Sequence, residues 1–255
     1  MQPLELYIHI PFCVKKCAYC DFLSGPAGEK EKEEYVKMLV DEIRNCPDTV
    51  QNYRVISVFF GGGTPSLLTG EQIGRLMDTV REIFTLDEDA EITMEMNPGT
   101  VTEEKLRKYR QAGVNRLSIG LQSVNDEELR LLGRIHTYEE FREAYHLARA
   151  NGFSNINVDL ISAIPGQTVE SWRRTLERVM ALSPEHISAY SLILEEGTTF
   201  YKKYVEDEAK EGPKLPDEDA ERQMYWDTET LMEKNGYHRY EISNYAKEGY
   251  ACRHN

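Results

Sequence analysis

Three cysteines near the N-terminus are the residues most able to do chemistry in this sequence. Cys13, Cys17 and Cys20 have the spacing C-x3-C-x2-C and follow Pro11-Phe12. They lie too close together for an efficient set of disulfides, and in a reducing compartment such a cluster more often binds metal. Three thiolates on a four-iron cubane would leave one iron open to an outside ligand. The alternative is a structural zinc site completed by His9 or a more distant histidine.

Polar and glycine-rich segments that follow apolar runs provide the other candidate residues. In 61–65, GGGTP, glycines would let a ligand approach the backbone, or would simply serve a tight turn. Glu95 ends another run, where a buried carboxylate needs a hydroxyl or a cation such as Arg116. Gln122 and Asp159 end two later runs. These positions indicate a binding surface that several segments build together.

The apolar runs alternate between strand and helix periods. We expect strands at residues 4–10, 55–60, 91–96, 116–121, 156–161 and 186–194. We expect helices at residues 30–44, 73–84, 102–112, 138–150 and 169–182. Six β/α units predict a parallel sheet with right-handed crossovers, either open and doubly wound or a complete or partial barrel. Both arrangements place functional residues at the carboxyl ends of the strands.

The pattern loosens after residue 194. Residues 195–219 are acidic and rich in lysine, and we expect them to form a solvated insertion. A helix at 218–234 and an edge strand at 237–245 should follow.

Composition limits the class of protein. The chain has 255 residues, 40% of them apolar, which is enough to bury one large core. Its net charge of -14 would repel a phosphate backbone, so we expect no nucleic-acid partner. No apolar run approaches the roughly 20 residues that cross a bilayer, and the first residues do not form a secretory signal. These features predict a cytoplasmic protein.

The segment 7–22, YIHIPFCVKKCAYCDF, closely resembles the signature of a radical S-adenosylmethionine (SAM) family that includes oxygen-independent coproporphyrinogen III oxidase and HemW. The resemblance implies a [4Fe–4S] cluster on Cys13, Cys17 and Cys20, with SAM on the open iron. It also implies a partial TIM-like (β/α)6 barrel with parallel strands. Matched position by position, the residues expected to contact SAM are Tyr7, Tyr19, Gly62, Gly63, Thr64, Glu95, Gln122, Arg134, Asp159 and Ile193.

Phe22 separates two functions within this family. The coproporphyrinogen oxidases carry a further cysteine two positions after the third ligand, and Phe22 stands there. The resemblance therefore favours a HemW-like haem chaperone, which binds and delivers haem. The alternative is the oxidase (dehydrogenase), which decarboxylates propionates through a 5′-deoxyadenosyl radical. Reductive cleavage of SAM is expected in either case. The implied partners are SAM, haem or porphyrin and an electron donor such as flavodoxin, and a homodimer is compatible with the resemblance.

The resemblance also divides the chain. Residues 1–200 would form the radical SAM core, with the cluster and the SAM site. Residues 201–255 would hold the insertion, a helix and the start of a truncated C-terminal region. The closing residues 252–255, CRHN, resemble the beginning of a longer motif that leads into a further domain.

Overall fold

The structure is a computed structural model that describes residues 1–207 and 211–254. Residues 208–210 of the expected insertion and Asn255 of the closing motif lie outside the described residues.

Six parallel strands form the main sheet in the order in which they occur along the chain. They are β1 (Gln2–Ile10), β2 (Tyr53–Gly62), β3 (Thr85–Met96), β4 (Arg116–Gln122), β5 (Asn155–Ser162) and β6 (His186–Ser191). Each strand pairs in parallel with the next. The order never reverses, which distinguishes this sheet from a doubly wound one. The expected partial (β/α)6 barrel is confirmed.

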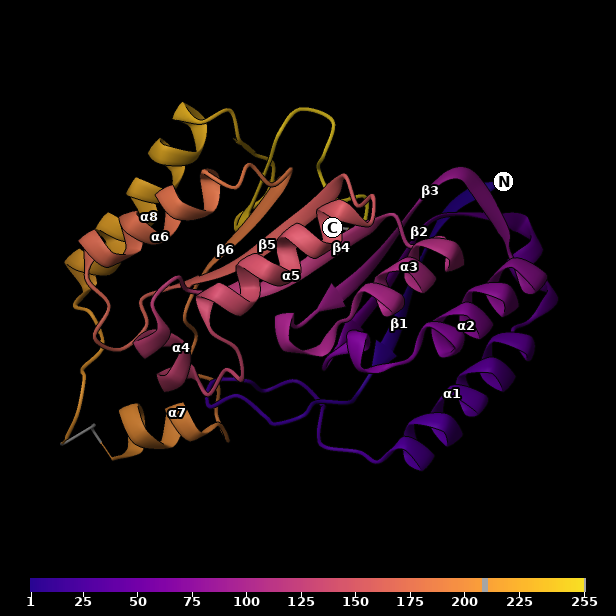
Figure 1. Cartoon of the computed structure of the whole chain (residues 1–255), viewed down its shortest axis with the longest axis horizontal. Coiled ribbons are helices and arrows are strands. Elements are labelled where there is room, and N and C mark those ends of the chain that lie inside the picture. The colour runs from indigo at the N-terminus through magenta and orange to yellow at the C-terminus, as the bar shows by residue number, and fades with distance from the viewer. Residues whose placement is uncertain (208–210, 255) are drawn as a thin grey trace.

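Helices connect successive strands and cover the outer face of the sheet (Figure 1). The long connecting helices are α1 (Glu29–Arg44), α2 (Gly70–Ile83), α3 (Glu103–Ala112), α5 (Tyr138–Ala150) and α6 (Val169–Met180). Short 3₁₀ turns lie at Asp48–Asn52, Pro65–Leu67 and Pro98–Thr100. Threonines cap α2, α5 and α6, and each accepts a bond from the third residue of its helix. Local sequence therefore sets where these helices begin.

Two short helices were not expected from the sequence. They are α4 (Asp126–Leu132) and α7 (Thr199–Tyr201), and a π-helical turn (Lys202–Glu206) continues α7. Phe200 and Tyr204 are buried and pack with Leu132, Ile161 and Ile164. The prediction of a solvated insertion is therefore wrong for residues 199–206, because two aromatic side chains four positions apart bury one face of this segment.

The last part of the chain extends the sheet. The helix α8 (Glu218–Lys234) packs against α6, and the strands β7 (His238–Arg239) and β8 (Asn244–Ala246) follow it. β8 pairs antiparallel with both β6 and β7. The single edge strand expected at 237–245 is therefore two short strands, and β6 ends three residues earlier than expected.

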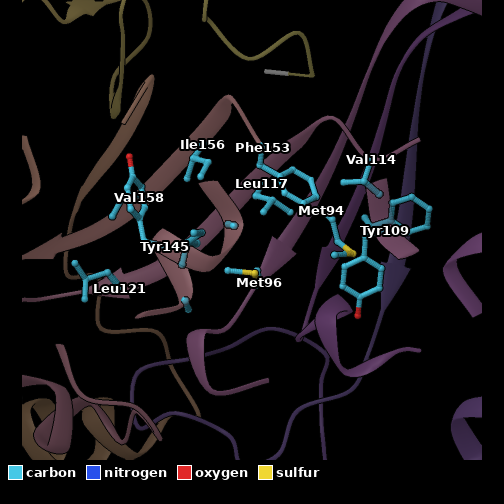
Figure 2. Close-up of a cluster of buried hydrophobic side chains, with 14 of the residues drawn as sticks. Met94, Met96, Tyr109, Val114, Leu117, Leu121, Tyr145, Phe153, Ile156 and Val158 are labelled. Carbon is cyan, nitrogen blue, oxygen red and sulfur yellow. The ribbon is translucent and has the colours of Figure 1, made fainter. Parts of the chain in front are cut away.

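The core fills the space between the sheet and its helices (Figure 2). Alternate residues of the central strands, such as Met94, Leu117 and Val158, are fully buried there. The intervening residues are mostly polar, so the two faces of the sheet differ sharply in character. Among the described residues, no helix has both the length and the apolar content needed to cross a membrane.

Trp172 of α6 links the core to α8, and this contact can be tested. Its Nε1 donates to Thr228 Oγ1 at 2.9 Å and to the Met224 carbonyl at 3.2 Å. Trp172→Phe removes this donor and part of a fully buried ring, so we expect the free energy of unfolding to fall by about 2–3 kcal/mol. Urea denaturation measures the loss. Trp226→Phe, on the exposed side of α8, should change it by less than about 0.5 kcal/mol. Equal losses in the two variants would contradict this role for Trp172.

Candidate functional site

The cysteine loop runs between β1 and α1, and backbone bonds fix its course. At its base, the Cys13 N–H donates to the Gly25 carbonyl at 2.9 Å. In its middle, the Ala18 N–H donates to the Leu132 carbonyl at the end of α4, at 2.9 Å. The Phe200 N–H of α7 donates to the Ala18 carbonyl, also at 2.9 Å. The two helices that the sequence did not reveal therefore hold the loop that carries the cysteines.

Polar groups from distant segments reach two of the three thiols. The Cys13 Sγ lies 3.5 Å from Thr64 Oγ1, so Thr64 contacts the cysteine loop directly. Arg134 Nη1 donates to Cys17 Sγ at 3.7 Å, and its Nη2 donates to the Gly120 carbonyl at 2.7 Å. Arg134 could have been an ordinary surface charge, but the structure places it against the cysteine loop.

The cysteines do not converge on a point. Within residues 1–207 and 211–254, no three His, Cys, Asp or Glu side chains are grouped so that they could hold a metal ion. His9 is engaged elsewhere, since Nε2 meets the Leu23 carbonyl at 3.1 Å and Nδ1 lies 3.4 Å from Tyr7 OH. The zinc alternative therefore has no assembled ligand set in the described residues. A cubane takes each thiolate at a different iron, so its three cysteines need not meet at one point.

The glycines at the end of β2 and directly after it are required by close packing. Gly62 has φ of 111°, and a Cβ there would lie 2.5 Å from His9 Cε1. A Cβ on Gly63 would lie 2.7 Å from the Phe12 carbonyl oxygen. A side chain at either position would therefore push the loop after β2 away from β1 and from the start of the cysteine loop. Contact of these glycines with SAM stays a prediction.

Glu95 lies at the end of β3, and no cation pairs with it in residues 1–207 and 211–254. Its Oε2 accepts the Gly62 N–H at 3.0 Å. Burial and the nearby Asp159 raise the pKa of Glu95 to about 8, so this carboxyl keeps its proton at neutral pH. The alternative ion pair with Arg116 is not formed within the described residues, where Arg116 Nη1 donates to Thr93 Oγ1 at 3.5 Å. Glu95 is therefore a largely neutral group at the strand end.

Asp159 belongs to a polar network that crosses β4, β5 and β6. Ser118 Oγ donates to one carboxylate oxygen at 3.0 Å, and Asn157 Nδ2 donates to the other at 2.8 Å. Asn157 Oδ1 in turn meets His186 Nδ1 at 2.6 Å. Burial raises the pKa of Asp159, and burial with the nearby Arg116 lowers the pKa of His186 to about 2. His186 is therefore neutral and must donate from Nδ1.

Gln122 and Arg134 lie together over Gly120. A Cβ on Gly120 would be 3.0 Å from Gln122 Nε2 and 3.1 Å from Arg134 Nη2. Gln122 has φ of 75°, which side-chain-bearing residues rarely adopt and which often marks a functional site. Arg134 Nε is buried and has no hydrogen-bond partner in the described part of the chain. The end of β4 therefore presents together a glycine, an amide and a guanidinium whose Nε has no partner among the described residues.

The two tyrosines and the isoleucine among the expected SAM contacts differ in their surroundings. Tyr7 is half exposed and stacks on Phe59, with ring centroids 6.0 Å apart. Burial raises the pKa of the Tyr19 phenol, an effect that the adjacent Arg134 partly offsets. Ile193 lies beyond the end of β6 and is 67% exposed. Of all the expected contacts, Ile193 has the least support from the structure.

Sequence reasoning missed Ser118, Asn157 and Tyr190. Burial raises the pKa of Tyr190, and the nearby Asp159 and Glu95 add to the shift. Each missed residue lies an even number of positions along its strand from a candidate or from another member of the network, so the two side chains share a face of the sheet. Period-two counting from Asp159 would have found Asn157.

These residues fit a [4Fe–4S] cluster with SAM. The cysteine loop brings three thiols into one region, where the Thr64 hydroxyl meets Cys13 Sγ and Arg134 donates to Cys17 Sγ. The buried, unsatisfied Arg134 Nε and the neutral carboxyl of Glu95 both retain capacity for a polar ligand.

Comparison with known proteins places the chain among related sequences. Residues 7–179 match the sequence family described as "Radical SAM superfamily". The "Heme chaperone HemW" of Escherichia coli (strain K12) is 43% identical over 100% of this chain and 66% of that protein. The protein of the same name in Bacillus subtilis (strain 168) is 38% identical over 98% of this chain and 65% of that protein. The chain therefore spans slightly less than two thirds of the length of these curated relatives.

A solved structure shares the fold. Coproporphyrinogen III oxidase (HemN) from Escherichia coli, described as a radical SAM enzyme, superposes with a TM-score of 0.86 at 32% identity. The match covers 97% of this chain and 56% of that chain.

The raised pKa of Glu95 predicts a pH dependence of stability. Between about pH 4.5 and 8 the folded chain keeps a proton that the unfolded chain has lost. The free energy of unfolding therefore falls as the pH rises through this window. In Glu95→Gln, whose amide oxygen can still accept the Gly62 N–H, this dependence should disappear. We expect Glu95→Gln to gain on the order of 2–4 kcal/mol relative to the wild type between about pH 5 and pH 9.

Urea denaturation of the cofactor-free chain at the two pH values measures the gain. Glu143→Gln, on the exposed face of α5, is the matched control, and its pH dependence of stability should follow that of the wild type. Parallel pH curves for the wild type and Glu95→Gln would show that Glu95 is ionised throughout.

Proposed function

Because the chain belongs to the radical SAM superfamily, we propose that residues 1–200 hold a [4Fe–4S] cluster and SAM and that the protein acts as a HemW-like haem chaperone. The observation that carries the choice within the family is Phe22, at the position of the oxidases' further cysteine. Phe22 is 65% exposed on the cysteine loop, so it offers a hydrophobic surface and no ligand. The curated relatives named heme chaperones support the same choice.

Cys13, Cys17 and Cys20 would hold three irons of the cluster. When bound, the cluster supplies an electron that cleaves the sulfonium of SAM, the chemistry for which the superfamily is named. Arg134 donates to the Cys17 sulfur, and the Thr64 hydroxyl would donate to Cys13 once that sulfur is a thiolate. Donors of this kind raise a cluster's reduction potential and orient its ligands. Packing of α4 and α7 against the loop would exclude water from one side of the cluster.

The proposed SAM contacts divide by chemistry. The backbone at Gly62, Gly63 and Thr64 would meet the methionine part. Carboxyl and amide groups suit ribose hydroxyls and amino groups, and Arg134 suits a carboxylate. Tyr7, Tyr19 and Ile193 would line the remaining apolar surface. The polar members of this set are Glu95, Gln122, Arg134 and Asp159.

The remaining partners are also proposals. Val14, Lys15 and Lys16 are exposed on the cysteine loop, and this basic edge would suit an acidic electron donor such as flavodoxin. Haem is the proposed cargo, a homodimer stays a prediction, and so does the cytoplasm as the compartment. The division between a core at 1–200 and a second region at 201–255 likewise stays a prediction.

The alternative activity is that of an oxygen-independent coproporphyrinogen III oxidase. The close superposition on HemN favours it. Phe22 argues against it. An anaerobic assay with SAM, a reductant and coproporphyrinogen III decides, because formation of protoporphyrinogen would replace our proposal with this one.

Cluster binding should depend on the three-cysteine loop alone. After anaerobic reconstitution we expect about four irons per wild-type chain and an EPR signal that changes when SAM is added. Cys17→Ser should lose most of this iron, whereas Cys46→Ser, which changes a lone cysteine of the segment after α1, should keep it. Iron analysis and EPR measure both. Undiminished cluster assembly in Cys17→Ser would refute the proposed ligand set.

Haem binding tests the chaperone proposal. Titration of the reconstituted chain with haem should give a saturable shift of the Soret band, and the Escherichia coli relative titrated in parallel is the positive control. A linear, non-saturating response from this chain beside saturation of the control would rule out haem binding by residues 1–255.

A further inference from the structure

Glu128 of α4 is a buried carboxylate to which we have so far assigned no role. It is 6% exposed and forms no ion pair within the described residues. Its Oε2 accepts from Ser123 Oγ at 2.6 Å and from Gln167 Nε2 at 3.0 Å. Its Oε1 accepts from Ser171 Oγ at 3.3 Å. One side chain therefore ties together the loop after β4, the loop after β5 and the start of α6.

The loop after β4 contains a strained residue. Gln122, with φ of 75°, immediately precedes Ser123. Ser123 Oγ donates to Glu128 and also accepts the Asn125 N–H at 3.0 Å, so it holds both sides of the turn. Conformations of this kind persist only where the surroundings hold them. Ser123, fixed by Glu128, provides that support next to Gln122.

The loop after β5 contains a second strained residue. Ala163 has φ of 59°. The Gln167 side chain spans this turn, since Oε1 accepts the Ile164 N–H at 3.4 Å and Nε2 reaches the Ile161 carbonyl at 3.5 Å. The same Nε2 donates to Glu128 Oε2. Gln167, fixed by Glu128, therefore supports the left-handed residue at the end of β5.

We infer that Glu128 is a positioning residue for the SAM site. Its carboxylate locks the left-handed turns that end β4 and β5, and this sets the direction of Gln122 and the path of the chain that leaves the strand of Asp159. The inference rests on the proposed SAM site. Within the described residues Glu128 bonds to Ser123, Gln167 and Ser171, none of which is a proposed SAM contact, so it acts through Ser123 and Gln167. A single oxygen that accepts from both loops couples their positions to each other.

The test measures the affinity of the anaerobically reconstituted chain for SAM, by titration of the EPR change. Glu128→Met keeps the length of the side chain but removes the acceptor, and we expect SAM to bind about tenfold more weakly. Iron content and the EPR spectrum without SAM should be unchanged. Glu128→Gln should stay near wild type, because its amide oxygen can replace Oε2 while its NH2 faces the Ser171 hydroxyl. Glu127→Met, the same change on the exposed side of α4, is the control.

Rescue separates positioning from a general loss of stability. Glycine adopts left-handed conformations without strain. The double variant Ala163→Gly/Glu128→Met should therefore bind SAM about threefold more tightly than Glu128→Met alone. No recovery, or wild-type affinity in a Glu128→Met chain that merely unfolds more easily, would overturn the inference. If Glu128→Met does not fold, Ser123→Ala serves instead, and unchanged affinity there has the same meaning. A wild-type chain that assembles the cluster but binds no SAM would refute the proposed site as well.

Discussion

The two backbone hydrogen bonds at Ala18 are the constraint on which the cysteine site depends. The chain between β1 and α1 has no helix and only an isolated bridge between Phe12 and Gly25, so its ends alone would not fix the thiols. The bonds to Leu132 and Phe200 place its middle between α4 and α7. Both helices are too short to be stable alone, and each is held by a buried apolar cluster. Packing far from the cysteines in sequence therefore determines where the cysteines lie.

Charge is distributed unevenly around the site. Arg134 brings a positive charge to the cysteine loop, whereas Glu95 and Asp159 lie at the ends of β3 and β5. Burial raises the pKa of both carboxyls, and the nearby Arg116 offsets part of this shift for Asp159. Asp159 recovers part of this cost through bonds from Ser118 and Asn157. Glu95 has only a backbone N–H, and it is consequently the group most responsive to a new polar neighbour.

The sequence predicted the elements whose signals are local. Periodicity located the six parallel strands and the long helices, and glycine and cysteine spacing located two loops of the site. It could not reveal contacts such as Arg134 with Cys17, which are 117 positions apart and depend on how α4 ends. α4 itself had a signal, an Asn125 cap and a closing Gly133, but only seven residues between them. The network around Asp159 required the register between strands, which alternation within one strand does not supply.

The fold separates the residues that stabilise it from those that can bind. Met94, Leu117 and Val158 are fully buried against the helices and supply the hydrophobic free energy of the sheet. The intervening positions carry Ser118 and Asp159, whose hydrogen bonds satisfy one another without an apolar filling. An incomplete barrel needs no packed interior, because its core lies outside the sheet. Burying polar side chains on the inner face carries a cost, as the raised pKa values of Glu95 and Asp159 show, and the bonds from Ser118 and Asn157 offset part of it.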